Sequence, residues 1–108
     1  MKPPKFAYYA PTSVDEAVEH LKRYEGDARP LSGGQSLVPM LNFRLTAPAA
    51  LIDLAHIPGL AFVREESGTI CLGGMTRQRA AENSAIVAQH LPLLREALGW
   101  TGHLPTRS

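Results

Sequence analysis

The chain has 108 residues, which is the size of one domain or of part of one. Eleven Lys and Arg stand against ten Asp and Glu, so the formal net charge is +1, and the sequence has neither the broad basic field that nucleic acid requires nor an acidic tail. Apolar residues make up 44% of the chain, which is enough for a folded core, but no apolar stretch reaches the ~20 residues of a membrane helix.

The first predicted elements are a strand and a helix. Residues 5–10 read as a short extended segment that Pro11 ends. Ser13 and Glu16 form a capping box, in which the hydroxyl accepts from the third helical amide and the carboxylate reaches back to the amide of Ser13. Gly26 suits the left-handed residue that closes the helix. One apolar stripe recurs at helical offsets, and it consists of Val14, Ala17, Val18, Leu21 and Tyr24.

The middle of the chain continues the alternation of strands and helices. Residues 28–31 are predicted to form a strand, residues 37–44 a short helix with Pro39 in its first turn, and residues 50–54 a second strand. Residues 61–65 and 69–73 are predicted to pair as a hairpin around a turn at residues 66–68.

The last predicted elements are helices. Thr76 is expected to cap a helix that runs to about Asn83. A second helix is predicted over residues 91–98, with Pro92 in its first turn and Trp100 packed against it. The whole pattern predicts a mixed fold of the α+β class.

Cys71 is the only cysteine, and this limits the redox chemistry of the chain. One thiol cannot form an internal disulfide framework, hold an iron–sulfur cluster or build a structural zinc site. Because Cys71 lies in an alternating apolar run, we expect a buried structural thiol. Redox chemistry must then come from an organic cofactor or a partner. No secretory signal follows Lys2 and Lys5, so a cytoplasmic location is expected.

Residues 32–36, Ser-Gly-Gly-Gln-Ser, lie between a predicted strand and a predicted helix. Gly33 and Gly34 permit positive φ and a close approach of the backbone to a ligand. The helix that follows presents free amides and the positive end of its dipole, which suits a phosphate or pyrophosphate. The lysine of an NTPase loop is absent, and so is the pattern G-x-G-x-x-G. On spacing alone, a plain turn remains the alternative reading.

The remaining polar residues predict neither a catalytic residue nor a metal ligand. The histidines lack metal-ligand spacing, and His20 is expected to be solvated on its helix. Asp53 is expected to cap the turn after its strand rather than to act as a base. Arg77 could face an anionic group, and His103 could lie near a cofactor groove; in both cases an ordinary exposed residue is the alternative.

Residues 32–42, Ser-Gly-Gly-Gln-Ser-Leu-Val-Pro-Met-Leu-Asn, resemble the first flavin-binding signature of a known family. That family is the FAD-carrying medium subunit of the molybdenum hydroxylases, which include CO dehydrogenase and xanthine dehydrogenase. The similarity covers essentially the whole chain, in the expected order, through Phe6-Ala7-Tyr8, Pro11 and residues 51–54, 57–60, 72–77, 91–94 and 102–103.

The resemblance implies an FAD-binding domain of the PCMH type, similar to vanillyl-alcohol oxidase, of which this chain is the first α+β subdomain. Backbone amides of residues 32–36 would hold the pyrophosphate, two leucines would flank it, and a third would contact the flavin from the hairpin. The implied cofactor-binding residues are Leu31, Ser32, Gly33, Gly34, Gln35, Ser36, Leu37 and Leu72.

The end of the chain departs from the family pattern. The family continues through an Arg-Asn pair into a second glycine-rich signature, whereas here Arg107 is followed by Ser108. We therefore expect residues 1–108 to be the N-terminal part of the domain, truncated before the second flavin-binding signature.

The function that the resemblance implies is electron transfer within a complex. A large subunit with the molybdenum cofactor would oxidise the substrate, and a small [2Fe–2S] subunit would relay electrons to FAD. The flavin would pass them to NAD or a quinone. Two alternatives stay open: a stand-alone flavin oxidase of the PCMH type, and a truncated, non-catalytic remnant.

Overall fold

The computed structural model describes residues 2–101, which fall into two compact units. The first unit ends at Pro58 and the second begins at Gly59. Each unit contains both strands and helices, as the predicted mixed class requires. No helix within residues 2–101 is long and apolar enough to cross a membrane.

The first unit is built on a three-stranded parallel sheet. Its strands are β1 (Ala7–Tyr9), β2 (Ala28–Leu31) and β3 (Ala50–Asp53), and their order across the sheet is β1-β3-β2. β3 is therefore the central strand, and it pairs with both neighbours. The predicted strands are confirmed, with β2 at its predicted bounds.

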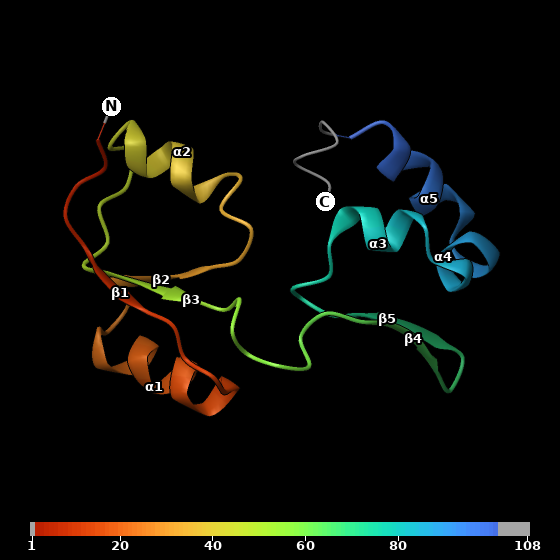
Figure 1. The fold of residues 1–108 in the computed structure, drawn as a ribbon, viewed down its shortest axis with the longest axis horizontal. Helices are drawn as coiled ribbons and strands as arrows, with labels where there is room; N and C mark the ends of the chain where they lie inside the picture. The colour runs from red at the N-terminus through yellow and green to blue at the C-terminus, as the bar shows by residue number, and fades with distance from the viewer. Residues whose placement is uncertain (1, 102–108) are drawn as a thin grey trace. The chain divides into compact units, whose positions relative to one another are not determined.

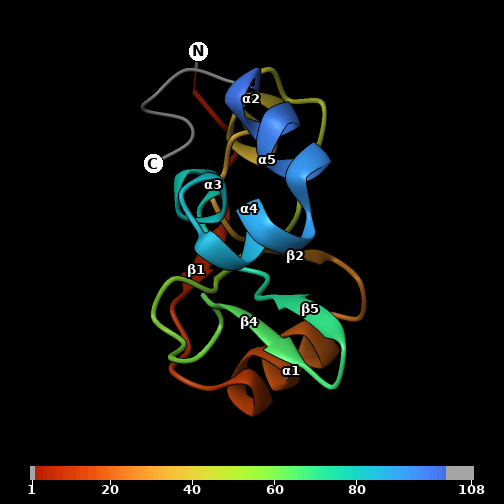
Figure 2. The ribbon, with the colours of Figure 1, turned by 90° about the vertical axis from the view of Figure 1, so that its right-hand side faces the viewer.

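Two helices provide the connections that parallel strands require. α1 (Val14–Arg23) connects β1 to β2, and α2 (Leu37–Asn42) lies between β2 and β3. The two helices lie on opposite sides of the strands in both ribbon views (Figures 1 and 2). The first unit is thus a β-α-β-α-β arrangement.

The core of the first unit lies along β3. Ala50 and Ile52 are fully buried, and Leu51 is nearly so. The buried side chains that α1 and β2 contribute, Ala17 and Ala28, are small, which permits close packing of helix on sheet. The larger members of the predicted helical stripe, such as Val14 and Val18, remain exposed, so the stripe is only partly a core face.

The N-terminus of α1 is capped, but not by the full capping box that the sequence predicted. The Ser13 hydroxyl accepts from the amide of Glu16 at 3.1 Å, as predicted. The Glu16 carboxylate does not return to the amide of Ser13; instead it accepts from the amide of Thr12 at 3.2 Å. At the C-terminus, Gly26 adopts the predicted left-handed conformation with φ of +89°, and so does Glu25 at +49°.

The second unit begins with an antiparallel hairpin of β4 (Val63–Glu66) and β5 (Thr69–Leu72). Glu66 pairs with Thr69, so the turn contains only Ser67 and Gly68, both at positive φ. The prediction of a three-residue turn was therefore wrong by one residue. Two central residues at positive φ are typical of a tight hairpin whose twist matches its strands.

Three short helices follow the hairpin and lie together on one side of it (Figures 1 and 2). They are α3 (Gln78–Glu82), α4 (Ala85–His90) and α5 (Pro92–Gly99). α4 was not predicted from the sequence, although Ser84 caps it by accepting from the amide of Val87 at 3.4 Å.

Three expectations for the second unit are corrected. Thr76 does not cap a helix, because its hydroxyl donates to the Phe62 carbonyl at 2.9 Å and accepts from the Phe62 amide at 3.2 Å. Trp100 is 86% exposed rather than packed on the last helix. Cys71 is half-buried rather than buried.

Candidate functional site

The glycine-rich segment, residues 32–36, leaves the sheet at the carboxyl end of β2. Leu31, its last strand residue, is in register with Asp53, the last residue of β3, and the Leu54 amide donates to the Leu31 carbonyl at 3.0 Å. The loop and the turn after β3 therefore lie at the same edge of the sheet. Open parallel sheets bind ligands outside the carboxyl ends of their strands.

Consecutive backbone amides in this loop are available to a ligand. Within the described part of the chain, no oxygen accepts a hydrogen bond from the amides of Gly33, Gly34, Gln35 or Ser36. The first bond that closes onto the loop comes from the Val38 amide to the Gly34 carbonyl at 3.0 Å. A row of unpaired amides that leads into a helix is suited to an anion with several oxygens, such as a diphosphate.

The two glycines of the loop meet different surroundings. Gly34 has φ of +78°, and a Cβ there would lie 3.0 Å from Cγ2 of Val38 and 3.3 Å from Cδ1 of Leu31. The fold itself therefore favours glycine at position 34. A Cβ on Gly33 would meet only Cγ of Gln35, at 3.9 Å. Among the described residues of the first unit, none requires glycine at position 33, so the bare backbone there permits close approach by a ligand.

The side chains around the loop agree with this arrangement. Leu31 and Leu37, at its two ends, are half-buried, whereas Ser32, Gln35 and Ser36 are exposed. The predicted residues 31–37 are thus brought together in one segment of the first unit. The remaining predicted contact, Leu72, ends β5 in the second unit, where it is 42% exposed.

A polar pair that the sequence analysis missed lies at the same edge of the sheet. The Tyr8 hydroxyl donates to Oδ2 of Asp53, and Oδ1 of Asp53 accepts from the Ala55 amide at 3.0 Å. The second contact confirms the predicted capping role of Asp53. The hydrogen bond from Tyr8 holds the pKa of Asp53 below its usual value and raises the pKa of Tyr8. No local signal predicts this pair, since its members are 45 residues apart.

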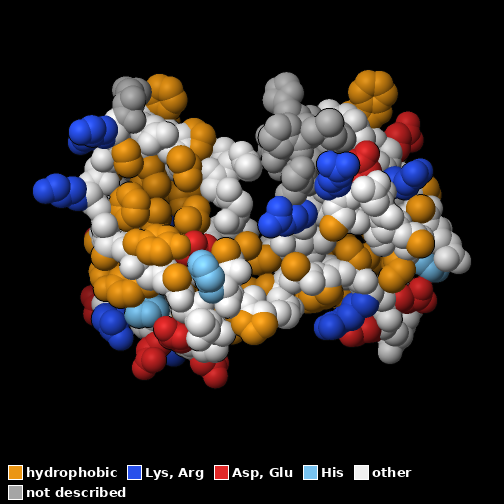
Figure 3. All heavy atoms as spheres, viewed as in Figure 1, with side chains coloured by type: hydrophobic (Ala, Val, Ile, Leu, Met, Phe, Trp, Pro, Cys, Tyr) orange, Lys and Arg blue, Asp and Glu red, His pale blue; other side chains and the backbone are white. Residues whose placement is uncertain are grey.

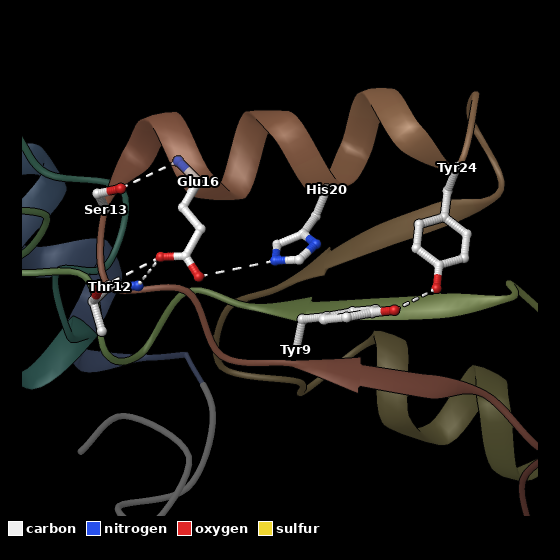
Figure 4. A network of polar contacts seen from close by, with 6 residues as sticks. All are labelled: Tyr9, Thr12, Ser13, Glu16, His20 and Tyr24. Carbon is white, nitrogen blue, oxygen red and sulfur yellow. Dashed lines mark hydrogen bonds and ion pairs between the residues drawn. The ribbon is translucent and has the colours of Figure 1, made fainter.

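His20 is not solvated, contrary to expectation. Its ring stacks on Tyr9 with centroids 4.3 Å apart, and its Nε2 lies 3.9 Å from Oε1 of Glu16 (Figure 4). The Tyr9 hydroxyl shares a 2.7 Å hydrogen bond with that of Tyr24, which raises the pKa of Tyr24. The spacing of His20 from Ala17 on the helix could have indicated that it faces the sheet.

The other candidate residues do not assemble a second site. His90 Nε2 lies 2.9 Å from Oε2 of Glu65, which links α4 to β4. Arg77 is the N-cap residue of α3. Within residues 2–101, no cluster of His, Cys, Asp and Glu could hold a metal ion. His103 lies outside the described residues, as do Arg107 and Ser108.

Apolar side chains are exposed on and after α2. On the viewed face of the first unit, such side chains gather between the strands and the α2 end (Figure 3). Four large ones belong to α2 and the segment after it: Val38, Met40, Phe43 and Leu45. The glycine loop is therefore followed by a mainly apolar surface, in which Arg44 is also exposed.

Comparison with known proteins gives consistent results. A family model described as "FAD binding domain in molybdopterin dehydrogenase" matches residues 4–108. The chain is 43% identical over 108 residues to the 6-hydroxypseudooxynicotine dehydrogenase complex subunit alpha of Paenarthrobacter nicotinovorans, covering all of this chain and 36% of that protein. It is 47% identical over 97 residues to the carbon monoxide dehydrogenase medium chain of Hydrogenophaga pseudoflava, covering 90% of this chain and 34% of that protein.

A solved structure of carbon monoxide dehydrogenase from Hydrogenophaga pseudoflava is similar in fold as well. It superposes with a TM-score of 0.94 at 44% identity, over 99% of this chain and 37% of that one. The chain therefore spans about a third of the length of the curated relatives it matches.

Proposed function

Because this chain belongs to the family of FAD-binding domains of molybdopterin dehydrogenases, we propose that it serves in the FAD-carrying subunit of a molybdenum hydroxylase complex. The family and the solved relatives confirm the predicted fold class and identify FAD as the cofactor. Residues 1–108 would form the first part of an FAD-binding domain of the PCMH type.

The observation that carries the proposal is that, within residues 2–101, no oxygen accepts a hydrogen bond from the amides of Gly33, Gly34, Gln35 and Ser36. We propose that the backbone of residues 32–36 donates to the pyrophosphate of FAD, with Leu31 and Leu37 on either side. Gly33 would let the diphosphate approach the main chain, because its position lacks a Cβ although a Cβ there would make only an ordinary contact, 3.9 Å from Cγ of Gln35. Leu72 would contact the flavin from the hairpin.

The chemistry of electron transfer belongs to the cofactor, since bound FAD can accept electrons from one partner and give them to another. The residues of this chain would bind and orient it, and none of them is proposed to break a substrate bond. We propose a [2Fe–2S] small subunit as the donor, a molybdenum-cofactor large subunit as the site of substrate oxidation, and NAD or a quinone as the acceptor. The names of the relatives as dehydrogenase subunits support this assignment.

The binding proposal is tested by substitution of Gly33 in the full-length protein. Gly33→Val should lower FAD occupancy about tenfold, because the added side chain fills the space proposed for the diphosphate, while the unfolding midpoint stays near that of the unsubstituted protein. Gly99→Ala in α5 is the matched control, since a Cβ there makes only an ordinary contact, 3.6 Å from Oε1 of Glu82. Unchanged flavin content in Gly33→Val would show that the loop is only a turn.

The electron path is tested by anaerobic reduction of the flavin. Substrate should bleach the flavin absorbance only when the molybdenum and [2Fe–2S] subunits are present, and addition of NAD⁺ or a soluble quinone should identify the acceptor. Direct reduction by substrate in the isolated subunit would favour the stand-alone oxidase instead. A correctly folded full-length protein without FAD would favour the remnant.

A further inference from the structure

The hydrogen bond between Tyr8 and Asp53 joins β1 to β3, whereas the glycine loop follows β2. Tyr8 lies on β1 and Asp53 ends β3, while the loop follows β2. Asp53 is half-buried, and Tyr8 is 53% exposed. The pair is therefore not a core contact. It nevertheless links β1, an outer strand, to the central strand β3, near the carboxyl end of the sheet where the loop begins.

A continuous series of contacts leads from this pair to the loop. Asp53 accepts from the Tyr8 hydroxyl and from the Ala55 amide, so its carboxylate fixes the backbone of the turn after β3. Within that turn, the Leu54 amide donates to the Leu31 carbonyl at 3.0 Å. Leu31 is the residue from which the loop departs, and its Cδ1 would lie 3.3 Å from a Cβ added to Gly34. The position of the loop's first residues thus depends on the turn that Asp53 holds.

The neighbouring tyrosine provides an internal comparison. Tyr9 follows Tyr8 on β1, and successive strand residues point to opposite faces. Tyr9 faces α1, where its ring stacks on His20 and its hydroxyl bonds to that of Tyr24 (Figure 4). The hydroxyl group of each tyrosine therefore makes one hydrogen bond, but only the bond of Tyr8 leads to the loop, through Asp53 and the turn after β3.

We propose that Tyr8 and Asp53 are a positioning pair that presets the glycine loop for the diphosphate of FAD without contacting the cofactor. The inference rests on the proposed function of the loop. Loss of the Tyr8 hydroxyl frees the Asp53 carboxylate from its partner on β1, and the turn then holds Leu31 less firmly. The loop would then become ordered only when FAD binds. The entropy cost of that ordering would lower the affinity for FAD.

The experiment compares FAD affinity among variants of the full-length protein after removal and return of the flavin. Tyr8→Phe should raise the Kd for FAD about fivefold, the scale of one hydrogen bond, whereas Tyr9→Phe should leave it within about twofold. Both variants lose one tyrosine hydroxyl, so their unfolding midpoints should fall by similar amounts. Asp53→Leu should weaken binding at least as much as Tyr8→Phe.

A conservative variant separates positioning from general packing. An Asn side chain at position 53 can accept from the Ala55 amide and donate from its own amide to the Tyr8 oxygen. Asp53→Asn should therefore keep the Kd for FAD near that of the unsubstituted protein. Equal FAD affinities for Tyr8→Phe and Tyr9→Phe would overturn the inference, as would an Asp53→Asn variant as weak as Asp53→Leu. Intact FAD binding in Gly33→Val would instead overturn the proposed function of the loop, and this inference with it.

Discussion

Each unit of the molecule contains one Gly-Gly pair, and the comparison of the two pairs separates what the fold requires from what it leaves open. In the first unit, Gly34 is closed in by Val38 and Leu31, while a Cβ on Gly33 would make only an ordinary contact, 3.9 Å from Cγ of Gln35. In the second unit, Gly73 is closed in and Gly74 has nothing within 4 Å of an added Cβ. In each pair, contacts within the unit explain why one position is glycine, and they do not explain the other.

The closed glycines differ in what encloses them. At Gly34 the conformation has positive φ and the nearest atoms belong to side chains, which can shift a little. At Gly73 the conformation is ordinary, but a Cβ would lie 2.2 Å from the Leu60 carbonyl oxygen and 2.8 Å from Cδ1 of Phe62. Backbone cannot withdraw as a side chain can, particularly where the Met75 amide donates to that same carbonyl at 2.9 Å. The two Gly-Gly pairs thus meet different constraints: positive φ and nearby side chains at Gly34, and nearby backbone at Gly73.

The largest effect should come from the enclosed glycine of the second unit. Gly73→Ala should lower the free energy of unfolding by about 3 kcal/mol, because the methyl group must displace the backbone of residue 60. Chemical denaturation followed by circular dichroism measures the change. A loss below about 1 kcal/mol would mean that the Leu60 segment relaxes freely, and the contrast with Gly34 would disappear.

The enclosed glycine of the first unit should tolerate the same change better. Gly34→Ala should cost about 1 to 2 kcal/mol, since an L-residue at positive φ is strained and Val38 must move by a few tenths of an ångström. The same denaturation measurement applies. If Gly34→Ala proved more damaging than Gly73→Ala, side-chain enclosure would outweigh backbone enclosure here.

The Tyr8–Asp53 pair adds a pH dependence to the first unit. The pKa of Asp53 is lowered in the folded state, so its contribution is present above the ordinary carboxyl pKa and is lost as the pH falls through the folded value. The pKa of Tyr8 is raised, so the contribution is also lost at high pH.

This pH dependence is measured as the stability difference between the unsubstituted protein and Tyr8→Phe. Because the pair is exposed to solvent, the difference should be small at pH 7, and it should shrink as the pH falls below about 4. Tyr9→Phe should show no such acid dependence, because its partner is a tyrosine rather than a carboxylate. A difference that stayed constant to pH 3 would show that the Asp53 carboxylate is not involved.

The smallest effects should come from the two open glycines. Gly33→Ala and Gly74→Ala should each change the free energy of unfolding by about 0.5 kcal/mol or less, with slight stabilisation where the unfolded chain loses freedom. Thermal denaturation without flavin provides the measurement. A large loss of stability in Gly33→Ala would remove the reason for assigning its open space to a ligand.

Local sequence signals were sufficient where the structure depends on local contacts. The cap at Ser13 and the left-handed Gly26 both follow from residues within a few positions of each other. The glycine loop was identified for the same reason, because strand, Gly-Gly and helix are adjacent in the chain. Its amides, however, could be recognised as unpaired only in the folded unit.

Several of the expectations that failed concern residues whose partners are distant. Thr76 reads as a cap because its sequence neighbours are helical, yet its hydroxyl bonds to Phe62 across the base of the hairpin. His20 reads as solvated beside charged residues, yet Tyr9 of β1 covers its ring. The link between Tyr8 and Asp53 depends on the pairing of β1 with β3, which no local pattern specifies.

The central place of β3 has a consequence for synthesis of the chain on the ribosome. β1 and β2 do not pair with each other, so neither can enter the sheet before residues 50–53 have left the exit tunnel. Until then β1 and β2 have no strand to pair with, so the nascent N-terminal segment can aggregate or be bound by chaperones. The glycine loop, made earlier, acquires its geometry only when translation has passed beyond it.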